Sequence, residues 1–151
     1  MSKRQGPESG FTLVELLGAI AIFSILVALV FQVLHTGINA SNKAKEGASL
    51  QREANIILSA LTTRHETESS YTILLDQNPS ASKISIRNET GEITVISQAS
   101  YFYTIYNDTT HELLPTEAVI EPNNDESLSI RLIVEDAQGQ SFEISTIISR
   151  M

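Results

Sequence analysis

The chain has no cysteine and no tryptophan, and only four of its 151 residues are proline. Without thiols it cannot form a disulfide framework, a thiolate nucleophile or a cysteine-bound zinc or iron–sulfur site. Aromatic residues make up 6% of the chain, and an excess of acidic residues gives a formal net charge of −8. Because a nucleic-acid binder needs a basic face for phosphates, we expect no direct binding of nucleic acid.

Recognised catalytic motifs are also missing, since the sequence contains no GxGxxG, P-loop, G-x-S-x-G or HExxH pattern. His35, His65 and His111 lie far apart without ligand spacing, and we expect each to be a surface or interfacial side chain. The acidic run Glu121–Glu126 offers oxygen ligands, but their order matches no recognised calcium loop, which favours a solvated turn. We therefore expect no enzyme activity, no metal site and no cofactor.

One long apolar run stands out against this composition. Residues 11–34 contain only four polar side chains, Thr12, Glu15, Ser24 and Gln32. As an α-helix this segment is about 36 Å long, enough to cross a hydrocarbon core of about 30 Å. A buried helix of a soluble domain is the alternative, but so short a chain has little material to surround such a helix. The run predicts a membrane-spanning segment.

The charges in front of this run predict its orientation. Lys3 and Arg4 precede it by a few residues, and the positive-inside tendency keeps such an N-terminus in the cytoplasm. The acidic remainder then lies outside the cytoplasmic membrane. An ordinary cleavable secretory signal has a shorter apolar region, so the run is too long for that class.

A second apolar pattern follows over residues 35–68. Apolar and small residues recur there at spacings of three and four, at Ala40, Ala44, Gly47, Leu50, Ala54, Ile57, Leu58 and Leu61. Charged residues lie off this stripe, at Lys43, Lys45, Glu46, Arg52, Glu53 and Arg64. The pattern predicts an amphipathic helix whose large apolar side chains pack beneath a globular domain. These side chains are Leu50, Ile57, Leu58 and Leu61.

The two apolar patterns can belong to one helix. No proline occurs between Pro7 and Pro79, so nothing forces the helix to end within residues 11–68. Gly37 is the expected position of a bend or break.

Beyond residue 70 the period changes to two, which is typical of strands. Strands are expected at 71–75, 83–87, 92–97, 101–106, 117–120, 128–134 and 142–148. Turns are expected at 88–91 and 136–139, and residues 109–125 are expected to be mostly loop. The fold class is α+β: a long N-terminal helix, membrane-spanning over 11–34 and amphipathic over 35–68, packed on a small, mostly antiparallel β-sheet domain over 69–151.

Glu15 is unusual because it lies only five residues into the apolar run. A carboxylate costs roughly 2.5–3.5 kcal/mol at the centre of a membrane helix on insertion scales, and less near the interface. Lys3 and Arg4 lie too far back to pair with it, and the helix offers no other cation. Either Glu15 reaches the lipid headgroups, or a cation from another molecule meets it in an assembled state.

The segment Gly10-Phe11-Thr12-Leu13-Val14-Glu15 follows a short basic leader and precedes a long apolar helix. In this it resembles the processing motif of type IV pilins and pseudopilins. The resemblance implies that a prepilin peptidase removes residues 1–10 by cutting between Gly10 and Phe11, and then methylates the amino group of Phe11. It also implies that Glu15 is the glutamate that meets the amino group of a neighbouring subunit in a filament.

Small residues give the apolar run a face on which other helices can pack closely, at Gly18, Ala21, Ser24 and Ala28. The resemblance implies four kinds of partner: the prepilin peptidase, other pilin or pseudopilin subunits, membrane lipid, and an assembly platform membrane protein driven by a cytoplasmic ATPase. After assembly the subunit would lie in a periplasmic or cell-surface filament.

Two departures from the family pattern narrow the role. Many pilins have a proline in the later part of the apolar helix and a disulfide-closed C-terminal loop, and this chain has neither. Both departures, with the small domain, favour a pseudopilin or minor pilin for protein secretion or DNA uptake in competence. The alternative is a signal-anchored extracytoplasmic protein whose β domain binds a ligand or partner.

Overall fold

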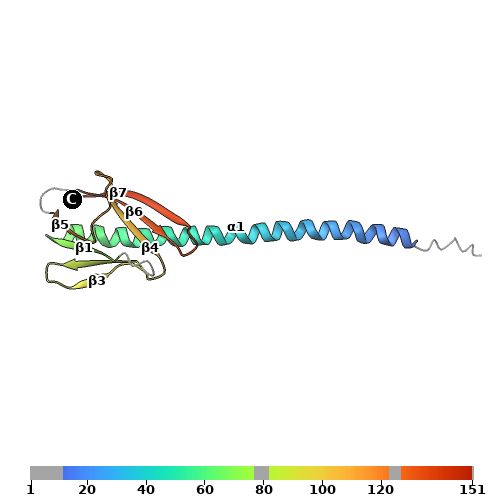
Figure 1. The fold of residues 1–151 in the computed structure, drawn as a ribbon, viewed down its shortest axis with the longest axis horizontal. Coiled ribbons are helices and arrows are strands. Elements are labelled where there is room, and N and C mark those ends of the chain that lie inside the picture. The colour runs from blue at the N-terminus through green and yellow to red at the C-terminus, as the bar shows by residue number, and fades with distance from the viewer. Residues whose placement is uncertain (1–11, 77–81, 123–126, 151) are drawn as a thin grey trace, which may run out of the picture. The chain divides into compact units, whose positions relative to one another are not determined.

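The computed structural model describes residues 12–76, 82–122 and 127–150, and in these residues it contains one helix and seven strands (Figure 1). The helix is α1 (Leu13–Thr67), and the strands are β1 (Tyr71–Asp76), β2 (Lys83–Asn88), β3 (Ile93–Val95), β4 (Phe102–Asn107), β5 (Glu117–Ile120), β6 (Leu128–Glu135) and β7 (Ser141–Ile148). The α+β prediction is confirmed: one long N-terminal helix packs against antiparallel sheets.

The chain divides into two compact units, one up to Lys43 and one from Ala44 onward. In the first unit α1 continues through Gly37, so the break expected there is not found. The large apolar side chains at the start of α1, from Leu13 to Leu34, are 54–76% exposed, apart from Val27, which is half-buried. By length and composition α1 is long and apolar enough to cross a membrane.

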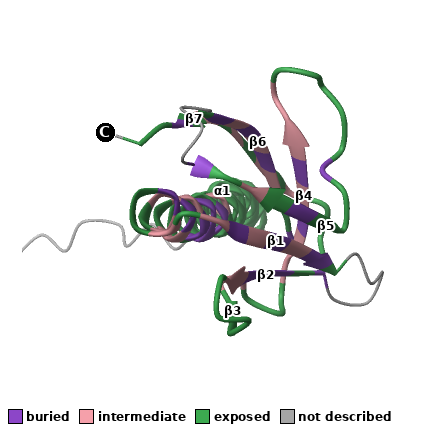
Figure 2. Cartoon of the chain, turned by 90° about the vertical axis from the view of Figure 1, so that its left-hand side faces the viewer, coloured by how far each residue is buried: buried purple, intermediate pink, exposed green. Residues whose placement is uncertain are grey.

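The second unit contains two antiparallel sheets around the C-terminal part of α1. The first sheet has the strand order β3-β2-β1-β5, and the second has the order β4-β6-β7. Figure 2 shows α1 with β6 and β7 on one side and β1 and β2 on the other. Sequence periodicity predicts strands but not their partners, so the division into two sheets was not predicted.

The core of the second unit lies between α1 and the inner faces of both sheets. Leu50, Ile57 and Leu61 of α1 are fully buried, as predicted, and Leu58 is partly buried against the same core. The strands contribute mostly β-branched side chains, among them Ile73, Ile84, Ile86, Ile105 and Ile130. Burying one such side chain stabilises the fold by about 1.5–3 kcal/mol, so this cluster holds helix and sheets together.

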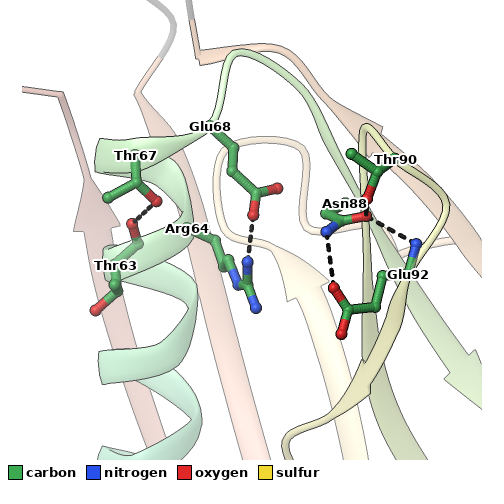
Figure 3. Close-up of polar contacts among 7 residues, drawn as sticks. All are labelled: Thr63, Arg64, Thr67, Glu68, Asn88, Thr90 and Glu92. Carbon is green, nitrogen blue, oxygen red and sulfur yellow. Dashed lines mark hydrogen bonds and ion pairs between the residues drawn. The ribbon is translucent and has the colours of Figure 1, made fainter.

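The turn between β2 and β3 forms where the sequence predicts it, at residues 88–91 (Figure 3). The Oδ1 atom of Asn88 accepts hydrogen bonds from Thr90 Oγ1 at 2.7 Å and from the backbone N–H of Glu92 at 2.8 Å. Gly91 has a φ of 85°, a conformation that costs glycine little. These bonds hold the β2–β3 hairpin together at its tip.

The turn between β6 and β7 is built in the same way. The Oδ1 atom of Asp136 accepts hydrogen bonds from the backbone N–H groups of Gln138 and Gln140, both at 2.9 Å. Gly139 follows with a φ of 80°. All seven expected strands are present, with ends that differ from the expected ones by at most two residues.

Candidate functional site

The N-terminus of α1 is closed by a capping box formed by Thr12 and Glu15. The hydroxyl of Thr12 accepts a hydrogen bond from the backbone N–H of Glu15 at 3.3 Å. In return, Glu15 Oε2 accepts from the backbone N–H of Thr12 at 3.1 Å and from its hydroxyl at 3.2 Å. The two residues thereby satisfy N–H groups that have no partner within the helix. The negative charge of Glu15 also lies favourably at the positive end of the helix dipole.

The expectation that Glu15 has no partner in its own helix is therefore wrong. That expectation considered cations only, whereas the capping box uses a hydroxyl and a backbone N–H. The signal was present in the sequence, because Thr12-Leu-Val-Glu15 has the T-x-x-E spacing of such a box. Both printed contacts use Oε2, and among the described residues Glu15 Oε1 accepts no hydrogen bond. Since the side chain is exposed, one carboxylate oxygen remains available to a second partner.

The four small residues expected on a packing face all lie on α1 and are exposed: Gly18, Ala21, Ser24 and Ala28. A side chain added at Gly18 would meet nothing within 4 Å in the single chain. Ser24 Oγ donates to the carbonyl of Ile20 at 2.8 Å, so its hydroxyl is satisfied within the helix. A face of this kind suits close approach of a second helix in an apolar medium. That packing remains a prediction.

Several predicted site residues lie outside the described part of the chain. These are the leader 1–10 with Gly10, and Phe11, so cleavage and methylation remain predictions. Of the acidic run Glu121–Glu126, the structure describes only the first two residues. Among the described residues, no group of three or more His, Asp or Glu side chains is placed to hold a metal ion.

Of the three histidines, His35 and His111 are exposed, as expected. The expectation for His65 is wrong, because this residue is fully buried in the last turn of α1. Its Nδ1 lies 3.2 Å from the hydroxyl of Tyr71, and the two rings meet edge to face. Burial lowers the pKa of His65, with a smaller contribution from the positive charge of Arg150. Burial also raises the pKa of Tyr71.

Glu53 is the second polar residue that the sequence placed wrongly, since it is buried rather than on the polar side of α1. Its Oε1 accepts a hydrogen bond from the hydroxyl of Tyr103 at 2.7 Å and from the backbone N–H of Gln98 at 2.9 Å. Burial, together with this carboxylate, raises the pKa of Tyr103. These bonds tie the segment between β3 and β4 to the helix, and they offset the cost of burying the charge.

An exposed apolar helix of membrane length in a chain with an α+β domain is a pilin-like architecture. Residues 7–31 match the family model described as "Prokaryotic N-terminal methylation motif". The chain thus carries the prepilin-type motif, consistent with the type IV pilin and pseudopilin family. No curated protein and no solved structure matches the chain.

The motif has consequences at a coarse level. It implies processing by a prepilin peptidase and assembly with pilins. With the apolar helix, it indicates anchoring in the inner membrane followed by pilus-like assembly. Proteins of the pilin family are structural rather than enzymatic.

Proposed function

We propose that this chain is a pseudopilin or minor pilin, a structural subunit of a type IV pilus-like filament that serves protein secretion or DNA uptake. One observation carries the proposal: the prepilin-type motif leads directly into a helix whose large apolar side chains are exposed. Such a surface needs an apolar surrounding, which lipid supplies before assembly and neighbouring helices supply afterwards.

Processing begins at the boundary between Gly10 and Phe11. A glycine before the cut leaves no side chain to obstruct the peptidase, and the cut creates a new α-amino group at Phe11, which is then methylated. Lys3 and Arg4 hold the leader in the cytoplasm until it is removed. The mature chain then consists of the membrane-spanning segment 11–34, the amphipathic segment 35–68 and the extracytoplasmic domain 69–151.

Glu15 acts in docking. The capping box holds its carboxylate at the N-terminal end of α1, with Oε2 engaged by Thr12. The remaining oxygen is available to the α-amino group of Phe11 from a neighbouring subunit. In a low dielectric such a pair attracts strongly, although desolvation offsets much of the gain. Its main effect is therefore on register, because a subunit docks only where the two charges meet.

The remaining contacts of assembly follow from the rest of the helix. The small residues Gly18, Ala21, Ser24 and Ala28 form the face on which other subunits pack. A platform protein in the membrane, driven by a cytoplasmic ATPase, moves the subunit from lipid into the filament.

The mature N-terminus tests the proposal. Intact mass and N-terminal sequencing should show a chain that begins at Phe11 and carries one methyl group. Gly10→Val should leave the precursor uncut, because a branched side chain then stands at the cleavage site. Gly6→Val is the matched control, since it makes the same substitution in the leader away from the cut, and it should be processed normally. A mature chain that begins at Met1 or near Ser41 would contradict the proposal.

A second candidate function is a signal-anchored extracytoplasmic protein whose β domain binds a ligand or partner. The capping box favours it in one respect, because it gives Glu15 a role within a single helix. Under this alternative the leader remains attached, and the same N-terminal analysis separates the two functions.

A further inference from the structure

A groove of about 830 Å³ lies along the exposed side of α1 in the second unit, next to the edge strand β3. One wall is formed by α1, including Arg52, Ile56 and Ser59. The other wall is formed by Thr94 of β3 and by Ile96, which follows it. Since β3 is held by the bonded hairpin turn at Asn88 (Figure 3), the groove exists before any partner binds.

The lining of this groove differs in charge from the rest of the chain. The chain has 18 acidic and 10 basic residues, yet the groove is lined by two arginines and no carboxylate. Arg64 is already paired with Glu68 one turn further along α1 (Figure 3). Arg52 is exposed and has no ion pair or hydrogen bond among the described residues. One turn after Arg52, Ile56 is 43% exposed. The groove thus offers an unpaired cation beside an exposed apolar side chain.

The complementary pair of features lies at the opposite edge of the same sheet. The strand order β3-β2-β1-β5 puts β5 at that edge. Along β5 the side chains alternate, so that Ala118 is buried while Val119 is 62% exposed. Glu121 follows two residues later, is exposed, and has no ion-pair partner among the described residues. We call Val119 and Glu121 the β5 ridge.

The spacings of the two surfaces agree. Two residues of extended chain separate Val119 from Glu121 by about 6.6 Å. Four residues of α-helix separate Ile56 from Arg52 by about 6 Å along the axis. A contact between Val119 and Ile56 therefore brings Glu121 within reach of Arg52.

We propose that the groove receives the β5 ridge of a second copy of this chain, with Val119 against Ile56 and Glu121 paired with Arg52. This inference rests on the proposed function, because membrane helices that pack together hold the two domains at high effective concentration. A weak contact then suffices. The exposed ion pair adds little affinity, but it discriminates this ridge from other surfaces and sets its register. Because the two surfaces differ and lie on opposite edges, the contact repeats from copy to copy without closing.

The absence of cysteine allows a direct test in the full chain, expressed with its assembly machinery. Ser59 lines the groove one turn from Ile56, so Ser59→Cys combined with Val119→Cys places one thiol on each surface. A short bismaleimide crosslinker should then give a ladder of two, three and more copies. Each single variant should give no product larger than a pair. Ser59→Cys with Ser145→Cys is the matched control, since Ser145 is exposed on β7 of the other sheet, and it should give no ladder.

The charge pair is tested in the same double-cysteine background. Arg52→Glu should lower the yield of the ladder about fivefold, and adding Glu121→Arg should restore it. Filaments that contain the processed chain but give no ladder, or no more ladder than the control pair, would overturn the inference and leave the proposed function standing. Crosslinking to a different protein would overturn the second copy as the occupant. An uncut N-terminus, visible in the intact mass of the same sample, would show failure of the proposed function and of the inference with it.

Discussion

The two parts of α1, up to Lys43 and from Ala44, share one secondary structure but differ in how their side chains are satisfied. In the first part the polar groups bond within the helix: Ser24 Oγ donates to the carbonyl of Ile20 at 2.8 Å, and Thr36 Oγ1 donates to that of Gln32 at 2.9 Å. In the second part the polar groups reach other elements of the fold. Ser49 Oγ lies 2.7 Å from the hydroxyl of Tyr101.

This difference shows what surrounds each part. A helix that satisfies its polar groups by itself can lie in lipid, where no water is available to bond them. A helix whose polar side chains bond to strands depends on the tertiary structure around it. Helix formation is therefore the same local process in both parts, and only the environment of the side chains differs.

The largest expected effect concerns Glu15, the one carboxylate in the first part of α1. Glu15→Ala should still be cut and inserted but should fail to enter filaments, because the amino group of the incoming subunit has no counter-charge. Glu15→Gln is sharper, because glutamine preserves a capping box while removing the charge. It should fail as well. Fractionation measures processing, and shearing followed by immunodetection measures incorporation.

The outcomes of this experiment separate two roles. If Glu15→Gln assembles normally while Glu15→Ala does not, the capping box is the important interaction and not the charge. Normal assembly of both variants would show that Glu15 has no essential part in docking.

The second expected effect uses Leu61, which is fully buried in the second part of α1. Leu61→Ala should lower the free energy of unfolding of the domain by about 2–5 kcal/mol, because it leaves a cavity in the core. Denaturant titration of the detergent-solubilised full chain, followed by tyrosine fluorescence, measures this loss. Leu29→Ala makes the same change at an exposed position of the first part and should leave the midpoint unchanged. Equal effects of the two variants would refute the contrast between the parts.

The third expected effect concerns Glu53 in its buried network. Glu53→Ala leaves the hydroxyl of Tyr103 and the N–H of Gln98 without their acceptor, which should cost about 1–3 kcal/mol in the same titration. Glu53→Gln keeps an acceptor oxygen and should cost less. If Glu53→Ala unfolds at the wild-type midpoint, the network contributes nothing to stability.

The smallest expected effect is a pH dependence that comes from His65. Its pKa is lowered in the folded state, so the unfolded chain binds the proton more readily. The stability that neutral His65 provides is therefore complete above pH ~6.5 and is lost as the pH falls from there through the folded-state pKa. The slope should not exceed about 1.4 kcal/mol per pH unit.

Variants at two histidines isolate this effect. His65→Phe keeps a ring in the core and should remove the pH dependence between pH 5 and pH 7 (a window of roughly the range in which histidine titrates). His35→Phe, at an exposed position of the first part, should preserve it. Persistence of the dependence in His65→Phe would assign it to another group.

Comparison of the expected and observed folds shows which information the sequence carries locally. The change of period from 3.6 to 2 near residue 70 predicted the helix and all seven strands, because each period depends only on neighbouring side chains. The pairing of strands depends on contacts between distant residues, so the two sheets were not predicted. The short pattern around Gly10 and Phe11 similarly sufficed for the prepilin-type motif.

The polar side chains show the limit of the same reasoning. Glu53 and His65 were placed at the surface because of their residue type. Their partners, Tyr103 and Tyr71, belong to strands that the periodicity does not connect with the helix. A buried polar residue is recognised only when its partner is known. The capping box at Thr12 and Glu15 was different, because both partners lie within four residues.

The position of β3 and β5 at opposite edges of one sheet has a consequence for the ends of any assembly built through the proposed contact. At one end the last copy presents an empty groove with Arg52, and at the other end the last copy presents an uncovered ridge with Glu121. The two ends are thus chemically distinct, and the filament has a direction that each subunit carries in its own sheet. A soluble molecule that imitates the ridge would block one end and leave the other free to grow.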